Sequence, residues 1–352
     1  MMAAFIRNSV CGGTFDVTSR YSNLQLAGIT VNGLVCSATD SVTRQVVAIK
    51  KIPRPFGSAD AAKQTLKQIK LFKYLQHENV VSLHDMFISP LEDIYLVTEF
   101  TGIDLGTILG SKPLDNQFIQ YFVYQILRGL KYIHSAGIVH RDLKPSKILI
   151  DQKCDLKIAD FYSARQTDAR MTGYVATRFY RAPEIMLTWQ QYGVEVDIWS
   201  VGCIFAEMIE GTPLFPGESP AHQLHVITEL LGSIPDYVVN RISTKNTMRY
   251  IQSLPELEKQ SLETRLKHAQ PDALDLIGKM LHYDPLQRID AATALTHPYL
   301  SRYHDPNDEP VAKEPFDYEL SNMSHSIESW KHFMYTEILS WGRVDDLATI
   351  DV

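Results

Sequence analysis

The sequence predicts an α+β fold with a small β-rich N-terminal lobe and a larger helical C-terminal lobe. From about residue 21 to residue 100, short apolar and β-branched runs alternate with polar turns, as antiparallel strands do. Beyond Gly102, apolar residues recur at steps of three and four, which indicates amphipathic helices. The change in pattern predicts a boundary between the lobes at residues 100 and 101.

The pattern predicts elements in a definite order along the chain. In the first lobe we expect strands, then one helix with apolar positions among lysines, then two more strands. In the second lobe we expect an amphipathic helix, a buried helix, a polar surface excursion and a last helix. The expected ranges are strands 34–38 and 45–49, helix 61–75, strands 81–88 and 94–98, helices 118–133 and 196–209, excursion 232–254, and helix 329–338.

Composition and charge exclude several classes of protein. The 352 residues carry a net charge of −7 and no long basic run, so we expect no direct nucleic-acid binding. The four cysteines are scattered, which fits a reduced compartment better than a disulfide scaffold or a zinc site. No apolar stretch approaches about 18 residues and the N-terminus lacks a signal-peptide pattern. We therefore expect a soluble protein of the cytoplasm and nucleus. We also expect it to be a monomer.

A segment between two predicted strands has the spacing of a phosphate-covering loop. Gly28 and Gly33 occupy the first and third glycine places of G-x-G-x-x-G, and Thr30 occupies the second. Alone, this segment is better interpreted as an ordinary β-turn. The V-A-I-K strand that follows ends at Lys50, the lysine that pairs with the α- and β-phosphates of ATP, and favours the functional interpretation. The predicted phosphate-covering segment is Ala27, Gly28, Ile29, Thr30, Val31, Asn32, Gly33, Leu34 and Val35.

Residues 140–147 read H-R-D-L-K-P-S-K, which is the H-R-D-L-K-x-x-N catalytic-loop pattern of protein kinases with one change. Asp142 takes the place of the base that accepts a hydroxyl proton, and Lys144 the place of a phosphate-facing cation. Lys147 stands where the pattern has a metal-binding asparagine. The segment predicts phosphoryl transfer and raises a question about metal binding.

A second metal-binding pattern begins at Asp160. The sequence Asp160-Phe161-Tyr162 matches D-F-G except for the tyrosine, and it predicts that Asp160 ligates Mg²⁺. We expect Phe161 to pack in the core. Tyrosine tolerates the torsions of glycine poorly, so we expect Tyr162 to change loop conformation rather than metal ligation.

The helix after Lys50 has Gln68 where a carboxylate that holds this lysine is expected. Glutamine can accept a hydrogen bond from Lys50 but contributes no charge, which weakens the contact by about 1 kcal/mol. A solvated glutamine on an exposed face is an equally good interpretation, and the sequence leaves both open.

The segment 171–184 contains Thr172-Gly173-Tyr174 ahead of Ala182-Pro183-Glu184. A Thr-x-Tyr motif in this place resembles the dual-phosphorylation lip of MAP kinases, and the central glycine resembles their stress-activated branch. The stretches 89–95, 184–190 and 205–211 resemble the fungal high-osmolarity-glycerol type. The resemblance runs from about residue 5 to residue 340. It implies a two-lobed protein kinase fold that uses ATP and Mg²⁺.

The resemblance also implies boundaries and supporting roles. It implies an N-terminal extension at 1–20, a kinase domain at 21–300 with lobes 21–100 and 101–300, and a docking segment with a tail helix at 301–352. Thr98 would be the gatekeeper before a hinge that ends at Gly102. Asp197 would support the catalytic loop, and Glu184 would pair with Arg288.

Regulation and partners are implied in the same way. Thr172 and Tyr174 would be phosphorylated by an upstream dual-specificity MAP kinase kinase. Arg141 and Arg165 would bind the phosphothreonine, with Lys67 in a third place, and Arg178 and Arg181 would bind the phosphotyrosine. The acidic patch Asp305, Asp308 and Glu309 would dock upstream kinases, phosphatases and Ser/Thr-Pro substrates such as transcription factors.

Two functions compete on these residues. Lys50, Asp142, Lys144 and Asp160 favour a working osmotic-stress MAP kinase. The substitutions at Thr30, Gln68, Lys147 and Tyr162 favour a catalytically weakened pseudokinase that docks partners in competition with an active paralogue. A third possibility, an ATP-binding fold without a signalling role, is disfavoured by the intact Thr172-Gly173-Tyr174 lip.

Overall fold

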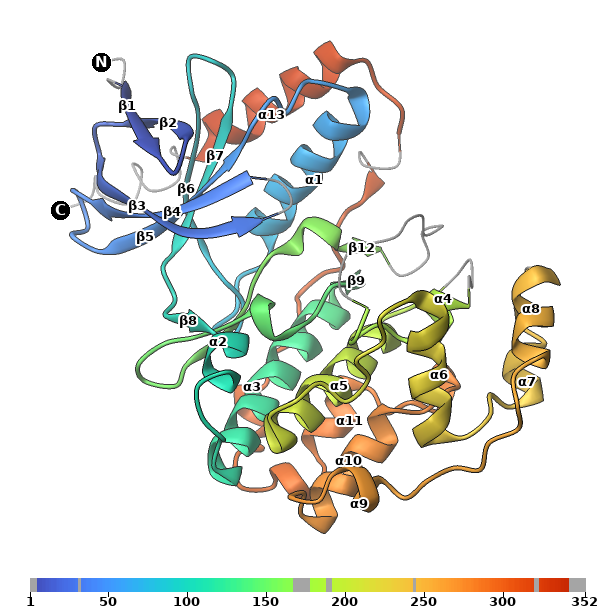
Figure 1. The fold of residues 1–352 in the computed structure, drawn as a ribbon. Coiled ribbons are helices and arrows are strands. Elements are labelled where there is room, and N and C mark those ends of the chain that lie inside the picture. The colour runs from blue at the N-terminus through green and yellow to red at the C-terminus, as the bar shows by residue number, and fades with distance from the viewer. Residues whose placement is uncertain are drawn as a thin grey trace. The chain divides into compact units, whose positions relative to one another are not determined.

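The computed structural model describes residues 5–30, 33–166, 178–187, 192–242, 245–319 and 323–341, which form two compact units (Figure 1). The first unit takes its residues from Met1–His77, Val81–Thr101 and Asp317–Val352. The second takes its residues from Glu78–Val80 and Gly102–Phe316. The first unit is rich in strands and the second is mostly helical, which confirms the predicted α+β fold class.

The first unit is built on a five-stranded antiparallel sheet with the strand order β3-β4-β5-β7-β6. Side chains alternate between the core and the surface along β4, so Cys36 and Ala38 are buried while their neighbours are half-exposed. The predicted strands are present, and β4 and β5 extend beyond the predicted ends. The bounds are β3 (Tyr21–Thr30), β4 (Gly33–Asp40), β5 (Val46–Ile52), β6 (Leu83–Ile88) and β7 (Ile94–Glu99).

An N-terminal hairpin of β1 (Phe5–Val10) and β2 (Gly13–Thr18) also belongs to this unit, and the sequence analysis did not predict it. Phe15 and Val17 of β2 are completely buried in the same core cluster as residues of β4, β5 and β7. The alternation of Thr14 to Thr18 after a double glycine was the available signal.

Two helices lie side by side in the first unit (Figure 1). Helix α1 (Ala59–Tyr74) begins at Ser58, whose hydroxyl accepts a hydrogen bond from Ala61 N. Lys73 of α1 donates from Nζ to Glu337 of α13 (Ile327–Trp341) at 2.5 Å. The predicted tail helix is therefore confirmed, and it packs on the helix that carries Gln68.

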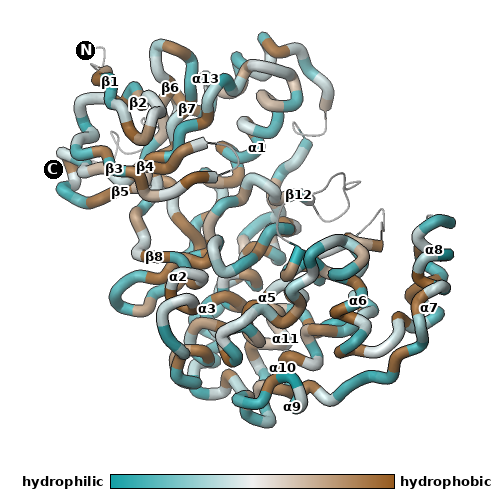
Figure 2. Tube along the Cα trace, viewed as in Figure 1, coloured by the Kyte–Doolittle hydropathy of each residue, from teal (hydrophilic) through white to brown (hydrophobic). Residues whose placement is uncertain are grey.

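The second unit is built around long helices with small strands beside them. Figure 2 shows hydrophobic residues along α5, whose side chains are buried from Val196 to Met208. None of the described helices is both long enough and apolar enough to cross a membrane. The helices are α2 (Leu105–Leu109), α3 (Asn116–Ser135), α4 (Pro183–Met186), α5 (Glu195–Glu210), α6 (Pro220–Leu231), α7 (Asp236–Val239), α8 (Lys245–Gln252), α9 (Leu262–Arg265), α10 (Pro271–Met280) and α11 (Ala291–Leu295).

Small strands in this unit flank the segments that carry Lys147 and Asp160. One three-stranded sheet has the order β11-β10-β8, and β12 pairs separately with β9. The strand bounds are β8 (Ile103–Asp104), β9 (Ile138–Val139), β10 (Ile148–Ile150), β11 (Leu156–Ile158) and β12 (Arg165–Gln166).

The predicted surface excursion at 232–254 is wrong in part. Its described residues include the helices α7 and α8, and Val238, Ile242 and Ile251 are buried. The spacing of Val238, Val239 and Ile242 by one and three residues is a helical pattern that the polar residues around it masked. This segment therefore contributes to the core of the second unit.

Candidate active site

The catalytic loop is held by a buried carboxylate. Asp197 of α5 accepts hydrogen bonds from His140 N and Arg141 N, each at 2.8 Å, and His134 Nε2 lies 3.0 Å from it. Burial acts to raise the pKa of Asp197, but the hydrogen bonds from His134 and from the backbone outweigh it and leave the pKa below its ordinary value. The predicted supporting role of Asp197 is confirmed.

The proposed base lies beside a cation. Lys144 Nζ lies 3.4 Å from Asp142 Oδ2, and the two side chains are 16% and 15% exposed, respectively. His140 Nδ1 accepts a hydrogen bond from Asp142 N at 3.3 Å, which fixes the backbone before the carboxylate. The structure thus brings together Asp142 and Lys144 on one short loop whose backbone is anchored to the core.

Lys147 forms an ion pair with Asp160. Lys147 ends the 3₁₀ helix η1 (Pro145–Lys147), and Asp160 directly precedes the 3₁₀ helix η2 (Phe161–Ser163). The antiparallel ladder of β10 and β11 brings the two positions together, because Ile148 pairs with Ile158 and Ala159 N donates to Lys147 O at 2.9 Å. Sequence reasoning placed Lys147 in the site but did not predict this partner.

Of the two positions where the sequence patterns place metal ligands, Asp160 offers side-chain oxygens and Lys147 does not. Asp160 offers carboxylate oxygens, which are the ligands Mg²⁺ prefers, but the Lys147 ammonium is bonded to Oδ2. Lys147 offers no oxygen in place of the expected asparagine amide. Among the described residues, no group of three or more His, Cys, Asp or Glu side chains could hold a metal ion. A cation held by Asp160 would therefore need further oxygen ligands from outside these side chains, such as phosphate or water.

Phe161 is buried in the core, whereas Tyr162 is partly exposed. Phe161 is completely buried and packs edge-on against His140 with ring centroids 5.1 Å apart, which confirms its predicted core role. Tyr162 lies within η2, and the residue with a positive φ is Asp160, at 66°. In this conformation tyrosine needs no glycine-like torsion.

The glycine-rich segment of the first unit forms the turn between β3 and β4. Gly33 has a φ of +136°, and a Cβ there would meet Lys51 O at 2.5 Å, so glycine is required. Thr30 Oγ1 donates to Gly33 O at 2.9 Å, which links the end of β3 to the start of β4. Val31 and Asn32 lie outside the described residues. Ala27, Gly28 and Ile29 lie on β3, and Leu34 and Val35 on β4.

Lys50, Thr98 and Gly102 have well-defined backbone positions. Lys50 of β5 pairs with Val35 of β4 and with Leu96 of β7. Thr98 of β7 pairs with Ala48. A Cβ at Gly102 would clash with the carbonyl oxygen of Ile150, so the chain requires glycine at the start of the second unit.

Gln68 is 1% exposed, so the interpretation of a solvated glutamine is wrong. Its Nε2 has no hydrogen-bond partner among the described residues. The amide therefore lies in the interior of the first unit at a desolvation cost.

Two arginines of the second unit lie near each other. The pKa of Arg165 is lowered by burial and by the positive charge of Arg141. Arg141 has a φ of 73°, its guanidinium lies 5.8 Å from the ring centre of Tyr192, and no acceptor bonds its Nε within the described ranges. Such a pair of half-buried guanidinium groups can bind an anion.

The two arginines predicted to bind the phosphotyrosine are among the described residues. Arg178 Nη1 donates to Glu218 O at 2.7 Å, and Arg181 N donates to Arg178 O at 3.0 Å. Thr172 and Tyr174 lie outside the described residues.

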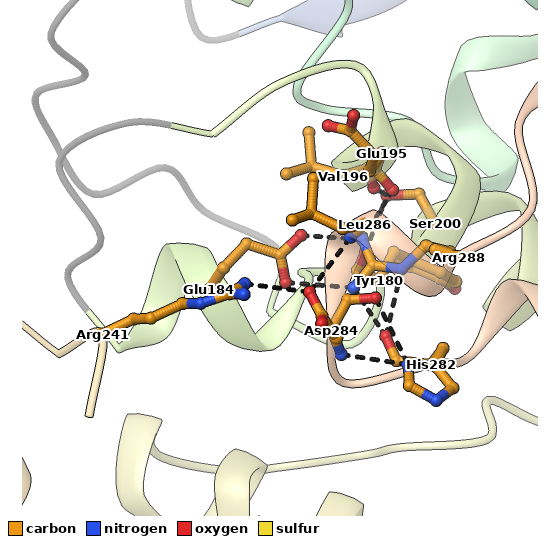
Figure 3. Close-up of polar contacts among 10 residues, drawn as sticks. All are labelled: Tyr180, Glu184, Glu195, Val196, Ser200, Arg241, His282, Asp284, Leu286 and Arg288. Atoms are coloured by element: carbon orange, nitrogen blue, oxygen red, sulfur yellow. Dashed lines mark hydrogen bonds and ion pairs between the residues drawn. The ribbon is translucent and has the colours of Figure 1, made fainter. Parts of the chain in front are cut away.

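Glu184 and Arg288 form the predicted structural pair (Figure 3). Arg288 also donates to Glu195 O and to His282 O, so its guanidinium joins α4, the start of α5 and the segment before η3 (Pro285–Gln287). Figure 3 shows the nearby Asp284 bonded to Arg241. This network confirms the predicted pairing and fixes the segment that begins at Pro183.

The acidic patch is only partly exposed. Glu309 is 4% exposed, and it accepts from His304 Nδ1 at 2.8 Å and lies 3.3 Å from Lys131 Nζ. Asp308 pairs with Arg128 Nη2 at 2.9 Å. Asp305 is exposed and accepts a hydrogen bond from Asn307 N. The patch is thus tied to α3 by Arg128 and Lys131, whose spacing of three residues on one predicted helix was the missed signal.

Comparison with known proteins identifies relatives over nearly the whole chain. The model of the protein kinase domain family matches residues 21–300. The mitogen-activated protein kinase HOG1 of Colletotrichum orbiculare is 59% identical over 347 residues, which are 99% of this chain and 97% of the relative. HOG1 of Cochliobolus heterostrophus is 58% identical over 98% of this chain and 97% of its own length. The hog-1 kinase of Neurospora crassa is 59% identical over 98% of this chain and 96% of its own length.

Proposed function

The chain belongs to the protein kinase family, in its HOG1-type mitogen-activated branch, and on that premise we propose a proline-directed serine/threonine kinase of an osmotic-stress pathway. It transfers the γ-phosphate of ATP to serine or threonine followed by proline. The pseudokinase alternative is not favoured, because relatives named as kinases match nearly the whole chain at 58–59% identity.

The position of Asp142 carries the proposal. Its carboxylate lies on a loop whose backbone at His140 and Arg141 is bonded to buried Asp197, so it is held still for a reacting hydroxyl. Asp142 accepts the hydroxyl proton as the oxygen attacks the γ-phosphorus. Lys144, 3.4 Å from Asp142, presents its ammonium to the transferred phosphoryl group.

ATP is the proposed phosphoryl donor, with a divalent cation held by Asp160. Lys50 contacts the α- and β-phosphates, as the lysine of the V-A-I-K strand does in protein kinases. Mg²⁺ is the cation proposed here, and when bound it neutralises charge on the β- and γ-phosphates.

Activation and partners are proposed on the same premise. An upstream dual-specificity kinase phosphorylates Thr172 and Tyr174. Arg141 and Arg165, which repel each other in the unphosphorylated chain, bind the phosphothreonine. We further propose a monomer of the cytoplasm and nucleus that acts on transcription factors and meets phosphatases at its acidic patch.

A radiometric assay tests the catalytic assignment. The full chain is phosphorylated at Thr172 and Tyr174 and given ATP, Mg²⁺ and a Ser-Pro peptide. Asp142→Asn should lower kcat by about 10²-fold to 10⁴-fold, the usual contribution of a positioned base. Asp155→Asn is the control, because this carboxylate is exposed on the turn between β10 and β11. Unchanged kcat in Asp142→Asn would overturn the assignment.

A further inference from the structure

The Lys147–Asp160 pair is fixed by the fold on both sides. Lys147 N donates to Lys144 O at 2.8 Å, and Lys147 O accepts from Ala159 N at 2.9 Å. Ile148, directly after Lys147, pairs with Ile158, two residues before Asp160, in the ladder of β10 and β11. The ammonium and the carboxylate therefore meet because their backbones are adjacent, not because two flexible side chains happen to reach each other.

The pair lies mostly out of water. The side chains of Lys147 and Asp160 are 15% and 18% exposed. Charges in such a place attract each other more strongly than on the surface, and removing one leaves the other without compensation. The ammonium is therefore expected to stay at Asp160 when a nucleotide binds.

The charges of the loop balance with this lysine in place. Lys144 lies beside Asp142 and Lys147 beside Asp160, so two cations face two carboxylates. With an asparagine at position 147, the four positions would carry one net negative charge and an amide oxygen. A divalent cation prefers that arrangement, whereas a fixed ammonium repels it and occupies a carboxylate oxygen.

We propose that the Lys147 ammonium replaces one of the two metal ions that serve ATP in protein kinases, so that the nucleotide complex of this chain holds a single divalent cation. The inference rests on the proposed function, because it concerns the nucleotide of that reaction. Lys147 contributes a permanent positive charge next to Asp160, and Asp160 keeps one oxygen for the remaining cation. Nucleotide binding then depends on one divalent cation.

Counting bound Mn²⁺ tests the proposal without measuring activity. The purified full chain is saturated with the non-hydrolysable analogue β,γ-imido-ATP, and bound Mn²⁺ per protein is measured by electron paramagnetic resonance. We expect one Mn²⁺ in the native chain and two in Lys147→Asn, because the amide restores an oxygen ligand and frees Asp160. The control Lys153→Asn removes the same charge from an exposed position on the same β10–β11 hairpin and should keep one Mn²⁺.

A second variant keeps the test decisive if Lys147→Asn does not fold. Lys147→Met removes the charge without adding a ligand, so it should hold one Mn²⁺ and bind the analogue about tenfold more weakly, since a positive charge beside the phosphates is lost. Two Mn²⁺ in the native chain, one in folded Lys147→Asn, or unchanged affinity in Lys147→Met would overturn the inference alone. Failure of the native chain to bind the analogue would overturn the proposed function and this inference with it.

Discussion

Glu184 and Arg288 form a bidentate ion pair with N–O distances of 2.7 and 3.1 Å, and neither side chain is accessible to water. Arg288 lies 104 residues after Glu184 in the chain, so the pair joins α4 to the segment around η3. The remaining guanidinium hydrogens are bonded to the backbone oxygens of His282 and Glu195. Each charge is therefore compensated only as long as the other is present.

Glu184→Ala should lower the free energy of unfolding by about 3–5 kcal/mol, because it leaves Arg288 buried and without its carboxylate. Urea denaturation followed by tryptophan fluorescence measures the loss. Lys279→Ala is the control, since its pair with Asp275 is half-exposed and should change stability by about 0.5 kcal/mol or less. Equal effects of the two variants would show that burial of the pair does not matter.

Sequence patterns proposed single residues for the candidate site, but not the contacts between them. Motif spacing identified Asp142, Lys144 and Asp160, because protein kinases place these groups at fixed positions in short segments. It did not predict that Lys147 bonds Asp160, since 13 residues separate them and only the β10–β11 ladder brings them together. Burial of Gln68 was unpredictable for a related reason.

The environment of a residue on an amphipathic helix depends on what packs against each face. The pattern of α1 left open whether the face bearing Gln68 was solvated, and its burial appears only in the packed first unit. The N-terminal hairpin was not predicted because its strands are short and polar on their outer face. The sequence pattern therefore indicated only an extension ahead of the first lobe. Glu309 likewise reads as part of an acidic loop until His304 and Lys131 are found beside it.

The raised pKa of Glu207 should make the stability of the protein depend on pH. Burial raises the pKa of Glu207 above its ordinary value, and the hydrogen bond from Tyr180, at 2.7 Å, only partly opposes this. A carboxyl with a raised pKa in the folded state holds its proton more tightly than in the unfolded chain, where the pKa is about 4.3. Its contribution to stability is full below that value and is lost as the pH rises through the folded pKa.

Glu207→Gln should therefore raise the melting temperature relative to the native chain more at pH 8 than at pH 4.5, because glutamine can accept the Tyr180 hydrogen bond without ionising. Differential scanning fluorimetry at both pH values measures this. Tyr180→Phe is the companion variant: it removes the hydrogen bond that lowers the pKa, and should make the loss of stability with pH steeper. A benefit of Glu207→Gln that shrinks with rising pH would contradict the prediction.

Replacing Arg165 should change the melting temperature differently before and after phosphorylation of Thr172. In the unphosphorylated chain Arg165→Gln should leave the melting temperature unchanged or slightly raised, because it relieves repulsion from Arg141 and the burial of a charge. After phosphorylation of Thr172 the native chain should gain stability from charge-assisted bonds, and Arg165→Gln should gain much less. Arg249→Gln, at an exposed position on α8, should gain as much as the native chain. Equal gains in all three proteins would exclude Arg165 as a phosphate ligand.

The acidic patch separates into a structural and an exposed carboxylate. Glu309→Gln should lower the melting temperature, because the buried contacts to His304 and Lys131 lose the negative charge of their acceptor. Asp305→Asn should leave the melting temperature nearly unchanged and weaken the binding of a basic docking peptide, measured by fluorescence polarisation at two salt concentrations. Peptide binding that survives Asp305→Asn unchanged would remove this carboxylate from the proposed docking site.

Gln68 and Gln125 form a matched pair of buried glutamines with opposite expected effects. Gln68 Nε2 has no partner among the described residues, so Gln68→Met should stabilise the protein by about 1 kcal/mol by removing an unpaired donor. Gln125 accepts from Asn79 Nδ2 and Leu156 N and donates to Cys154 O, so Gln125→Met should destabilise it by about 2 kcal/mol or more.

Urea denaturation of both variants beside the native chain decides between two accounts of Gln68. If the Gln68 amide is an unpaired group in the core, the two substitutions shift the midpoint in opposite directions with unchanged slopes. A loss of stability in Gln68→Met comparable to that in Gln125→Met would mean that the Gln68 amide makes bonds of similar strength, such as one that its Oε1 accepts from Lys50 Nζ.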